Sequence, residues 1–182
     1  MFEGCKDIIE IKFINFKTNE VNDMSFMFNK CSNLINLDLS NFNTENVNNM
    51  KAMFQLCSKL NNLEVKNFIT NKVTDMGWMF AECSNLIELD VSNFNTENVN
   101  NMSTMFQDCS KLNKLEVKNF KTNKVTDMSF MFNKCSNLID LDVSNFNTEN
   151  VSVSENMFYN CGNNIKEKIK KLVNFKRFDN IY

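Results

Sequence analysis

The sequence predicts an α/β repeat protein that forms a right-handed solenoid of about seven coils. Every cysteine lies on one lattice with a step of 26 residues, and columns of phenylalanine, leucine and valine keep the same step. A second period of 52 residues is superimposed on the first, because neighbouring coils differ while alternate coils are alike. A repeat unit of this size cannot bury its apolar face alone, so successive units must stack.

Each coil is expected to contain one short strand. In "LDLS", apolar and polar residues alternate from Leu37 to Ser40, which is the period of a strand with one buried face. The polar stretch "NTENV" that follows predicts a turn, because Asn and Thr side chains bond to nearby backbone. Proline is absent and only 3 glycines occur, so asparagine has to supply most of the turns.

A short helix is predicted after the turn. The stretch "DMSFMFNKC" places Met24, Met27, Phe28 and Cys31 at the spacing of one helical face. Asp23 precedes them as an N-cap. One strand and one helix per 26 residues falls within the range of leucine-rich repeats, so we expect a leucine-rich-repeat-like solenoid. With strands about 5 Å apart, the coils would form a rod roughly 30–35 Å long.

The repeat stops after Cys161, and the remaining segment predicts an amphipathic helix. Its apolar residues fall on one helical face: Ile165, Ile169, Leu172 and Val173. We therefore expect a leucine-rich repeat solenoid over residues 1–164, with a truncated first coil, and a C-terminal amphipathic capping helix over 165–182. The basic character of this helix also suits an anionic membrane surface, but covering the open end of the solenoid is favoured.

The repeat "MFNKCSNLINLDLSNFNTENVNNM" is similar to the BspA-type leucine-rich repeat, and most closely to its mycoplasma-type lipoprotein variant of unknown function. The shared elements, MFxxCSxLxxLDLSxFxTxxVxxM, run from Met1 to about Cys161. The resemblance implies a bacterial surface protein with a role in adhesion or host contact. It implies no chemistry and transfers no binding residues. The first coil departs from the pattern with "IIEIKFINF", and the last has Ser154 where methionine is expected.

The cysteine column is the most regular feature, and it has several interpretations. Its members are Cys5, Cys31, Cys57, Cys83, Cys109, Cys135 and Cys161. No two lie close in sequence and histidine is absent, so neither a zinc site nor an activated thiolate is expected. Disulfides between stacked coils would be within reach, although seven is an odd number and stacked side chains point the same way. The favoured interpretation is a column of small buried hydrophobic residues.

A column of acidic residues marks the outer face of the predicted strands. It consists of Asp38, Glu64, Asp90, Glu116 and Asp142. Lys66 and Lys118, two positions further on, would neutralise part of it. The favoured interpretation is a solvated face that protects the sheet. The alternative is an acidic track for a basic partner or Ca²⁺, although no Asp-Gly-rich calcium loop is present.

A second candidate surface is a column with alternating aromatic residues. It reads Phe26, Ala52, Trp78, Thr104, Phe130 and Asn156. On a helix these positions would lie about 200° from the buried methionine. Phe26, Trp78 and Phe130 would then be partly exposed and form a contact stripe, since aromatic residues dominate interface hot spots. The alternative is that they pack on each other or over the turn.

Composition excludes several classes of function. A net charge of −2 argues against a nucleic-acid binder, and no apolar run is long enough to span a membrane. No catalytic constellation or cofactor motif is present, so we predict a non-enzymatic scaffold without a cofactor that binds a protein or glycan. By resemblance it would be at a cell surface or secreted, although no signal peptide or lipobox is visible. The alternative is a spacer module that belongs to a larger exported protein and has no partner of its own. End-to-end self-association through the first coil is also expected.

Overall fold

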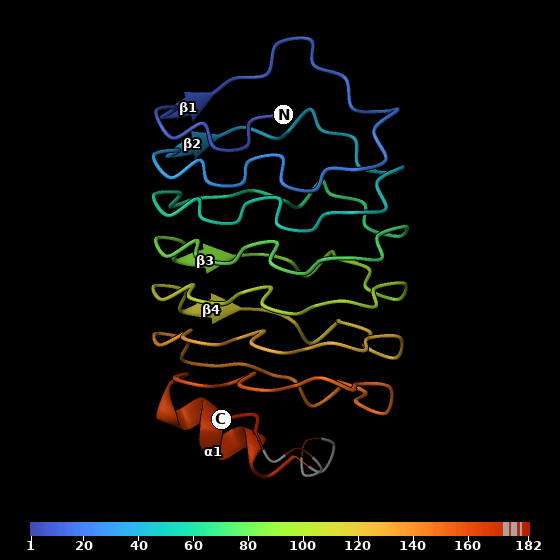
Figure 1. Cartoon of the computed structure of the whole chain (residues 1–182), viewed down its shortest axis with the longest axis vertical. Helices are drawn as coiled ribbons and strands as arrows, with labels where there is room; N and C mark the ends of the chain where they lie inside the picture. The colour runs from blue at the N-terminus through green and yellow to red at the C-terminus, as the bar shows by residue number, and fades with distance from the viewer. Residues whose placement is uncertain (173–174, 176–177, 179) are drawn as a thin grey trace.

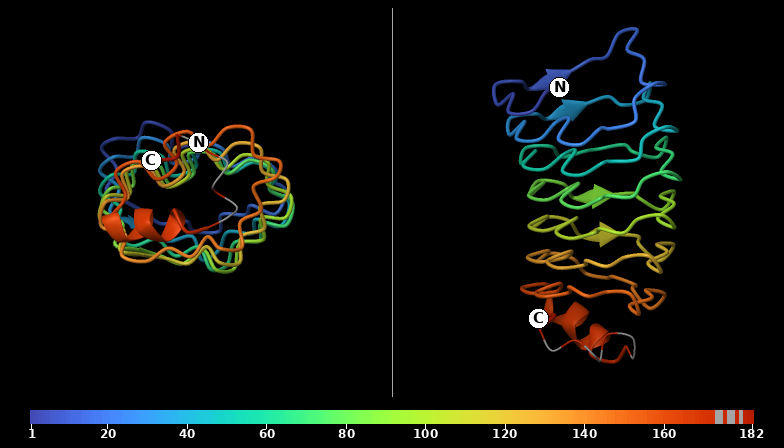
Figure 2. Two further views of the ribbon diagram at one scale, coloured as in Figure 1. Left: turned by 90° about the horizontal axis from the view of Figure 1, so that it is seen from below. Right: turned by 45° about the vertical axis from the view of Figure 1, so that its right-hand side comes forward.

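The computed structural model describes residues 1–172, 175, 178 and 180–182, and shows a stack of similar coils (Figure 1). Seen along the stack, the coils overlap and each follows a flattened ring around a filled centre (Figure 2). The chain starts at one end of the stack, and its only described α-helix lies at the other end (Figure 1). The predicted repeat solenoid is confirmed.

The strands are short and lie at the predicted place in the coil. They are β1 (Glu10–Ile11), β2 (Asn36–Leu37), β3 (Glu88–Leu89) and β4 (Lys114–Leu115). The strands β1 and β2 pair in parallel, as do β3 and β4, and each pair joins residues one coil apart. A second parallel ladder of single bridges runs from Asp23 and Asn49 to Val153. Neighbouring coils are therefore joined along two lines.

The predicted short helix in each coil is wrong. In its place is a chain of tight turns, with positive φ angles of 56° at Phe26 and 62° at Lys30. The N–H groups of Met27 and Cys31 donate to carbonyls three residues earlier, as in β-turns with positive φ at the third residue. The N–H groups of Phe26, Phe28 and Lys30 donate instead to the next coil, at 2.8–2.9 Å. In a helix the N–H groups of Phe28 and Lys30 would bond within the coil and could not join this ladder.

The turn chain explains why the pattern suggested a helix. It points inward the same four side chains that a helix would, and these are buried: Met24, Met27, Phe28 and Cys31. Asp23 is also not a helix cap. Its Oδ1 accepts the N–H of Ser25 at 2.8 Å and so closes a local turn. Aspartate or asparagine at the same position of the following coils does the same.

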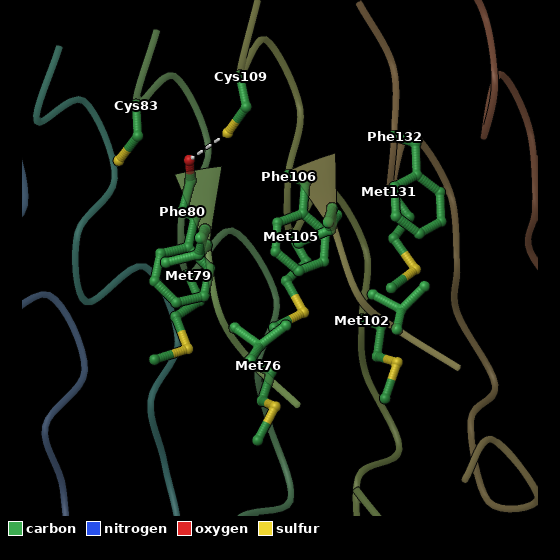
Figure 3. Packing of buried hydrophobic residues seen from close by; sticks show 14 of the residues in the cluster. Met76, Met79, Phe80, Cys83, Met102, Met105, Phe106, Cys109, Met131 and Phe132 are labelled. Atoms are coloured by element: carbon green, nitrogen blue, oxygen red, sulfur yellow. Dashed lines mark hydrogen bonds between the residues drawn. The ribbon is translucent and has the colours of Figure 1, made fainter. Parts of the chain in front are cut away.

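A stack of phenylalanine rings runs through the core. Its members are Phe2, Phe28, Phe54, Phe80, Phe106, Phe132 and Phe158. Successive centroids are 5.6–5.7 Å apart and the planes differ by 4–10°. This is an offset-stacked arrangement, which aromatic pairs favour. Buried methionines pack beside the rings (Figure 3).

A threonine column ties the coils together on another side of the ring. The buried hydroxyl of Thr96 donates to the carbonyl of Lys121 at 3.0 Å and accepts the N–H of the same residue at 2.7 Å. Thr44 and Thr70 each make the same pair of hydrogen bonds to one residue of the coil that follows. These hydroxyls satisfy backbone groups that a hydrophobic residue would leave unpaired.

The C-terminal segment differs from the long helix predicted over 165–182. Helix α1 (Asn163–Ile169) is shorter, and its buried Ile165 and Ile169 join the core; Val173 lies outside the described residues. Beyond it, the carbonyls of Asn180 and Ile181 accept the N–H groups of Asn156 and Phe158. Phe175 meets Phe158 edge-on, with centroids 5.7 Å apart. Both α1 and the described residues after it therefore pack on the last coil.

Within the described residues, no helix is both long and apolar enough to cross a membrane.

Candidate functional site

The cysteine column is a buried hydrogen-bonded ladder. All seven cysteines are free, and six of them are buried. The thiol of Cys109 donates to the carbonyl of Phe80 in the preceding coil at 3.2 Å (Figure 3). The other five buried thiols make the same bond to the preceding coil. The sequence predicted buried cysteines but missed this donor role.

Burial sets the chemistry of these thiols. It raises the pKa of Cys109 to about 12 and that of Cys161 to about 11, because the thiolate would lose its hydration. Burial likewise raises the pKa of Cys57, Cys83 and Cys135. Among the residues that the structure describes, no group of three potential metal ligands gathers. The column is therefore poorly suited to nucleophilic chemistry.

The acidic column lies on the exposed strand face, as predicted. Its five side chains are all exposed: Asp38, Glu64, Asp90, Glu116 and Asp142. A shallow hollow of about 280 Å³ is lined by Glu64, Asp90 and Glu116 among others, and the Nζ of Lys66 lies 3.5 Å from Oδ2 of Asp90. Lysine thus stands beside this column on alternate coils, at Lys66 and Lys118, and the charge of the column is partly neutralised.

The aspartates of this column bond to their own backbone. Asp90 Oδ1 accepts the hydroxyl of Ser92 at 2.6 Å and its N–H at 3.0 Å, and these bonds lower the pKa of Asp90. Asp142 has the same pair of bonds to Ser144, and its pKa is also lowered. These carboxylates serve to close the turn after each strand, which favours a structural role for them.

The aromatic column is partly exposed on alternate coils. Phe26 is 37% exposed and Trp78 is 36% exposed, while Phe130 is half-buried. The intervening Ala52 and Thr104 are buried. The prediction that these aromatic rings reach the surface agrees with their positions, although its helical reasoning was wrong.

The backbone at this column is left-handed in every coil. The six residues have φ between 52° and 63°: Phe26, Ala52, Trp78, Thr104, Phe130 and Asn156. Glycine and asparagine adopt this conformation readily, whereas a bulky side chain is an outlier there. Only the last coil has asparagine. The aromatic residues therefore occupy positions where the backbone disfavours them.

A hollow adjoins the third aromatic residue of the column. It has a volume of about 360 Å³ and is lined by six residues: Gln107, Phe130, Asn133, Lys134, Asn156 and Tyr159. Tyr159 is 50% exposed. Sequence reasoning named Phe130 as a candidate and Asn156 as a member of its column, but missed the other four. The available signal was Tyr159, the one aromatic residue in its column. The other members are Glu3, Asn29, Gln55, Ala81, Gln107 and Asn133.

Comparison with known proteins supports the fold. The sequence profile described as "Mycoplasma protein of unknown function, DUF285" matches residues 1–88 and 57–172. No curated protein matches the chain. A leucine-rich repeat protein of T. pallidum has a similar structure, with a TM-score of 0.58 and 19% identity over 94% of this chain and 73% of that one. At this identity the likeness shows a shared leucine-rich repeat fold.

Two other solved structures are less similar. Leucine-rich repeat proteins of Eubacterium ventriosum and Bacteroides ovatus match with TM-scores of 0.47 and 0.42 and identities of 20% and 18%. They align with 71% and 85% of this chain, and with 35% and 44% of their own lengths.

Proposed function

Because the chain belongs to the DUF285 family of mycoplasma proteins of unknown function, we propose from its own surface that it is a non-enzymatic scaffold that binds a protein or glycan. The binding surface is the aromatic column, with Phe26, Trp78 and Phe130 as anchors. The observation that carries this proposal is the presence of exposed aromatic rings at left-handed backbone positions.

Two physical arguments support this surface. A left-handed conformation costs a non-glycine residue roughly 1–2 kcal/mol, so aromatic residues on three coils weaken the fold. Strained residues of this kind persist where they serve a function. Aromatic side chains also contribute large contact areas at binding interfaces. The buried Ala52 and Thr104 share this backbone conformation, so it is the exposure of the rings that singles out Phe26, Trp78 and Phe130.

The acidic strand face is the secondary candidate for binding. Asp38, Asp90 and Asp142 already accept hydrogen bonds from the turn that follows them. Glu64 and Glu116 are the members without such a bond among the described residues. A basic partner would therefore meet two unengaged carboxylates on alternate coils, which is a weaker surface than the aromatic column.

The proposal is tested by binding measurements on the whole chain. The wild type and the triple variant Phe26→Asn, Trp78→Asn, Phe130→Asn are compared on a glycan array and against purified extracellular-matrix proteins. Asparagine suits the left-handed backbone, so the variant should remain folded. A ligand bound by the wild type and lost in the variant supports the proposal. If nothing is bound, the spacer alternative replaces the proposal. If binding survives the three changes, the aromatic column is not the binding surface.

Placement at a cell surface is part of the same proposal and follows from the resemblance to BspA-type repeats. It is tested by treating intact cells with protease. Loss of the protein from intact cells, with a cytoplasmic control protein preserved, is the expected result. Survival of the protein until the cells are lysed would refute a surface location.

The finer architecture completes the proposal: about seven coils, with α1 and the tail after it capping one end. At the other end, end-to-end association of two copies is proposed through the first coil. There Phe2, Ile8 and Phe13 are only partly buried, and Ile14 is 85% exposed. Sedimentation velocity should show a dimer that Ile14→Asp weakens. A monomer at every concentration would refute the association.

A further inference from the structure

The three aromatic positions have different surroundings, although two of them lie in identical sequences. The stretch Asp23–Leu34 recurs letter for letter at Asp127–Leu138. The coils that come next differ, however. The coil after Phe26 has Gln55 at the position where the coil after Phe130 has Tyr159. Tyr159 and Phe130 line the same hollow and are both accessible. This part of the aromatic column therefore presents two rings instead of one.

Polar groups with unused bonding capacity surround the two rings. Within the described part of the chain, the side chains of Gln107, Asn156, Lys134 and Tyr159 make no hydrogen bond or ion pair. The Nδ2 of Asn133 reaches the carbonyl of Asn156 at 3.4 Å. Lys134 is exposed and is the single charged residue among the six that line the hollow. The hollow thus combines apolar ring faces, amide and hydroxyl groups, and one positive charge.

We propose that this hollow binds a saccharide that carries a carboxylate. This inference rests on the proposed binding function and names its ligand and site. A sugar ring has an apolar face of C–H groups, which suits contact with Phe130 or Tyr159, and a rim of hydroxyls. The amides of Gln107 and Asn156 can donate to and accept from those hydroxyls. The ammonium of Lys134 pairs with the carboxylate.

Size and polarity favour a saccharide over a protein partner. A hollow of about 360 Å³ lies within the range of small-molecule sites, roughly 300–1,000 Å³. A stable protein interface needs about 800 Å² on each partner, usually with apolar residues at its centre. Around these two rings the lining is instead mostly amide. The positive charge favours an acidic sugar over a neutral one.

Calorimetric titration of the full chain tests the proposal. The first probe is an oligosaccharide of alternating glucuronic acid and N-acetylglucosamine, and the second is a neutral chitin oligosaccharide of the same length. We expect the acidic probe to bind the wild type at least tenfold more tightly. Phe130→Asn and Tyr159→Gln should each weaken it tenfold or more. Lys134→Gln should remove the preference for the acidic probe.

The matched control is Lys30→Gln, which makes the same change as Lys134→Gln in the same local sequence but away from the hollow. It should leave both affinities unchanged, and melting curves should show all four variants folded. The proposal is overturned if the wild type binds neither probe, if Lys30→Gln removes the preference for the acidic probe as Lys134→Gln does, or if Lys134→Gln has no effect. A ligand found in the wider binding tests and lost in the triple variant would keep the proposed function despite that failure.

Discussion

Raising the pH from 7 to 9.5 should remove most of the stability of the fold, because its buried thiols cannot ionise. In an unfolded chain a thiol has a pKa of about 8.5. In the folded chain, burial raises the pKa of Cys161 to about 11 and that of Cys109 to about 12. It also raises the pKa of Cys57, Cys83 and Cys135.

The sign and size of the effect follow from proton linkage. The folded state holds protons that the unfolded state loses, so stability is complete below the unfolded pKa and falls as the pH rises toward the folded pKa. One pH unit above the unfolded value, each thiol costs about 1.4 kcal/mol. The five thiols from Cys57 to Cys161 together cost about 7 kcal/mol, which is comparable with the whole stability of many domains.

Urea unfolding at pH 7, 8, 9 and 9.5, followed by circular dichroism in the presence of a non-thiol reductant, measures this loss. Lysine and tyrosine titrate mainly above this window. The matched variant Cys109→Ala has one thiol fewer, so its loss across the window should be smaller by about 1.4 kcal/mol. An unfolding free energy that stays constant from pH 7 to 9.5 would refute the reasoning. So would an equal loss in wild type and variant.

Three further changes test the packing. Thr96→Val should cost about 2–4 kcal/mol of unfolding free energy in urea titrations, because it leaves a backbone N–H and carbonyl unpaired; exposed Thr126→Val should cost less than about 1 kcal/mol. Phe106→Ala, in the middle of the ring stack, should cost about 3–5 kcal/mol, and a calorimetric change below about 1 kcal/mol would contradict a continuous stack. Lys30→Gly should raise the stability by about 0.5–1 kcal/mol by relieving a left-handed backbone, whereas Lys59→Gly, in a turn without positive φ, should lower it.

The repeat lattice allowed the buried columns to be identified from sequence. Every coil places a given position in the same environment, so one interpretation of Phe28 or Cys31 applied to all its equivalents. The backbone conformation could not be read in the same way. Spacings of three and four residues suit both a helix and a chain of turns, and the positive φ at Phe26 has no glycine to announce it.

The candidate site shows a second limit of reading one column at a time. The sequence predicted that Phe26, Trp78 and Phe130 would reach the surface, but not that Phe130 would border a hollow. That hollow depends on Tyr159, which belongs to the following coil and to another column. Whether Tyr159 lines the hollow depends on how two coils stack, and the spacing of hydrophobic residues in the sequence does not predict this.

The exact duplication of Asp23–Leu34 isolates what makes one copy different from the other. Phe26 and Phe130 both have φ of 56°, and each is followed by the same asparagine and lysine, so their local structures are the same. Any difference in binding must then come from the neighbouring coils, where Tyr159 replaces Gln55, Asn156 replaces Ala52 and Gln107 replaces Glu3. In a stack of this kind, one substitution on an outward column changes the surface of two coils without disturbing the core. Duplication of coils can therefore multiply a binding surface, and single outward changes can then give each copy its own ligand.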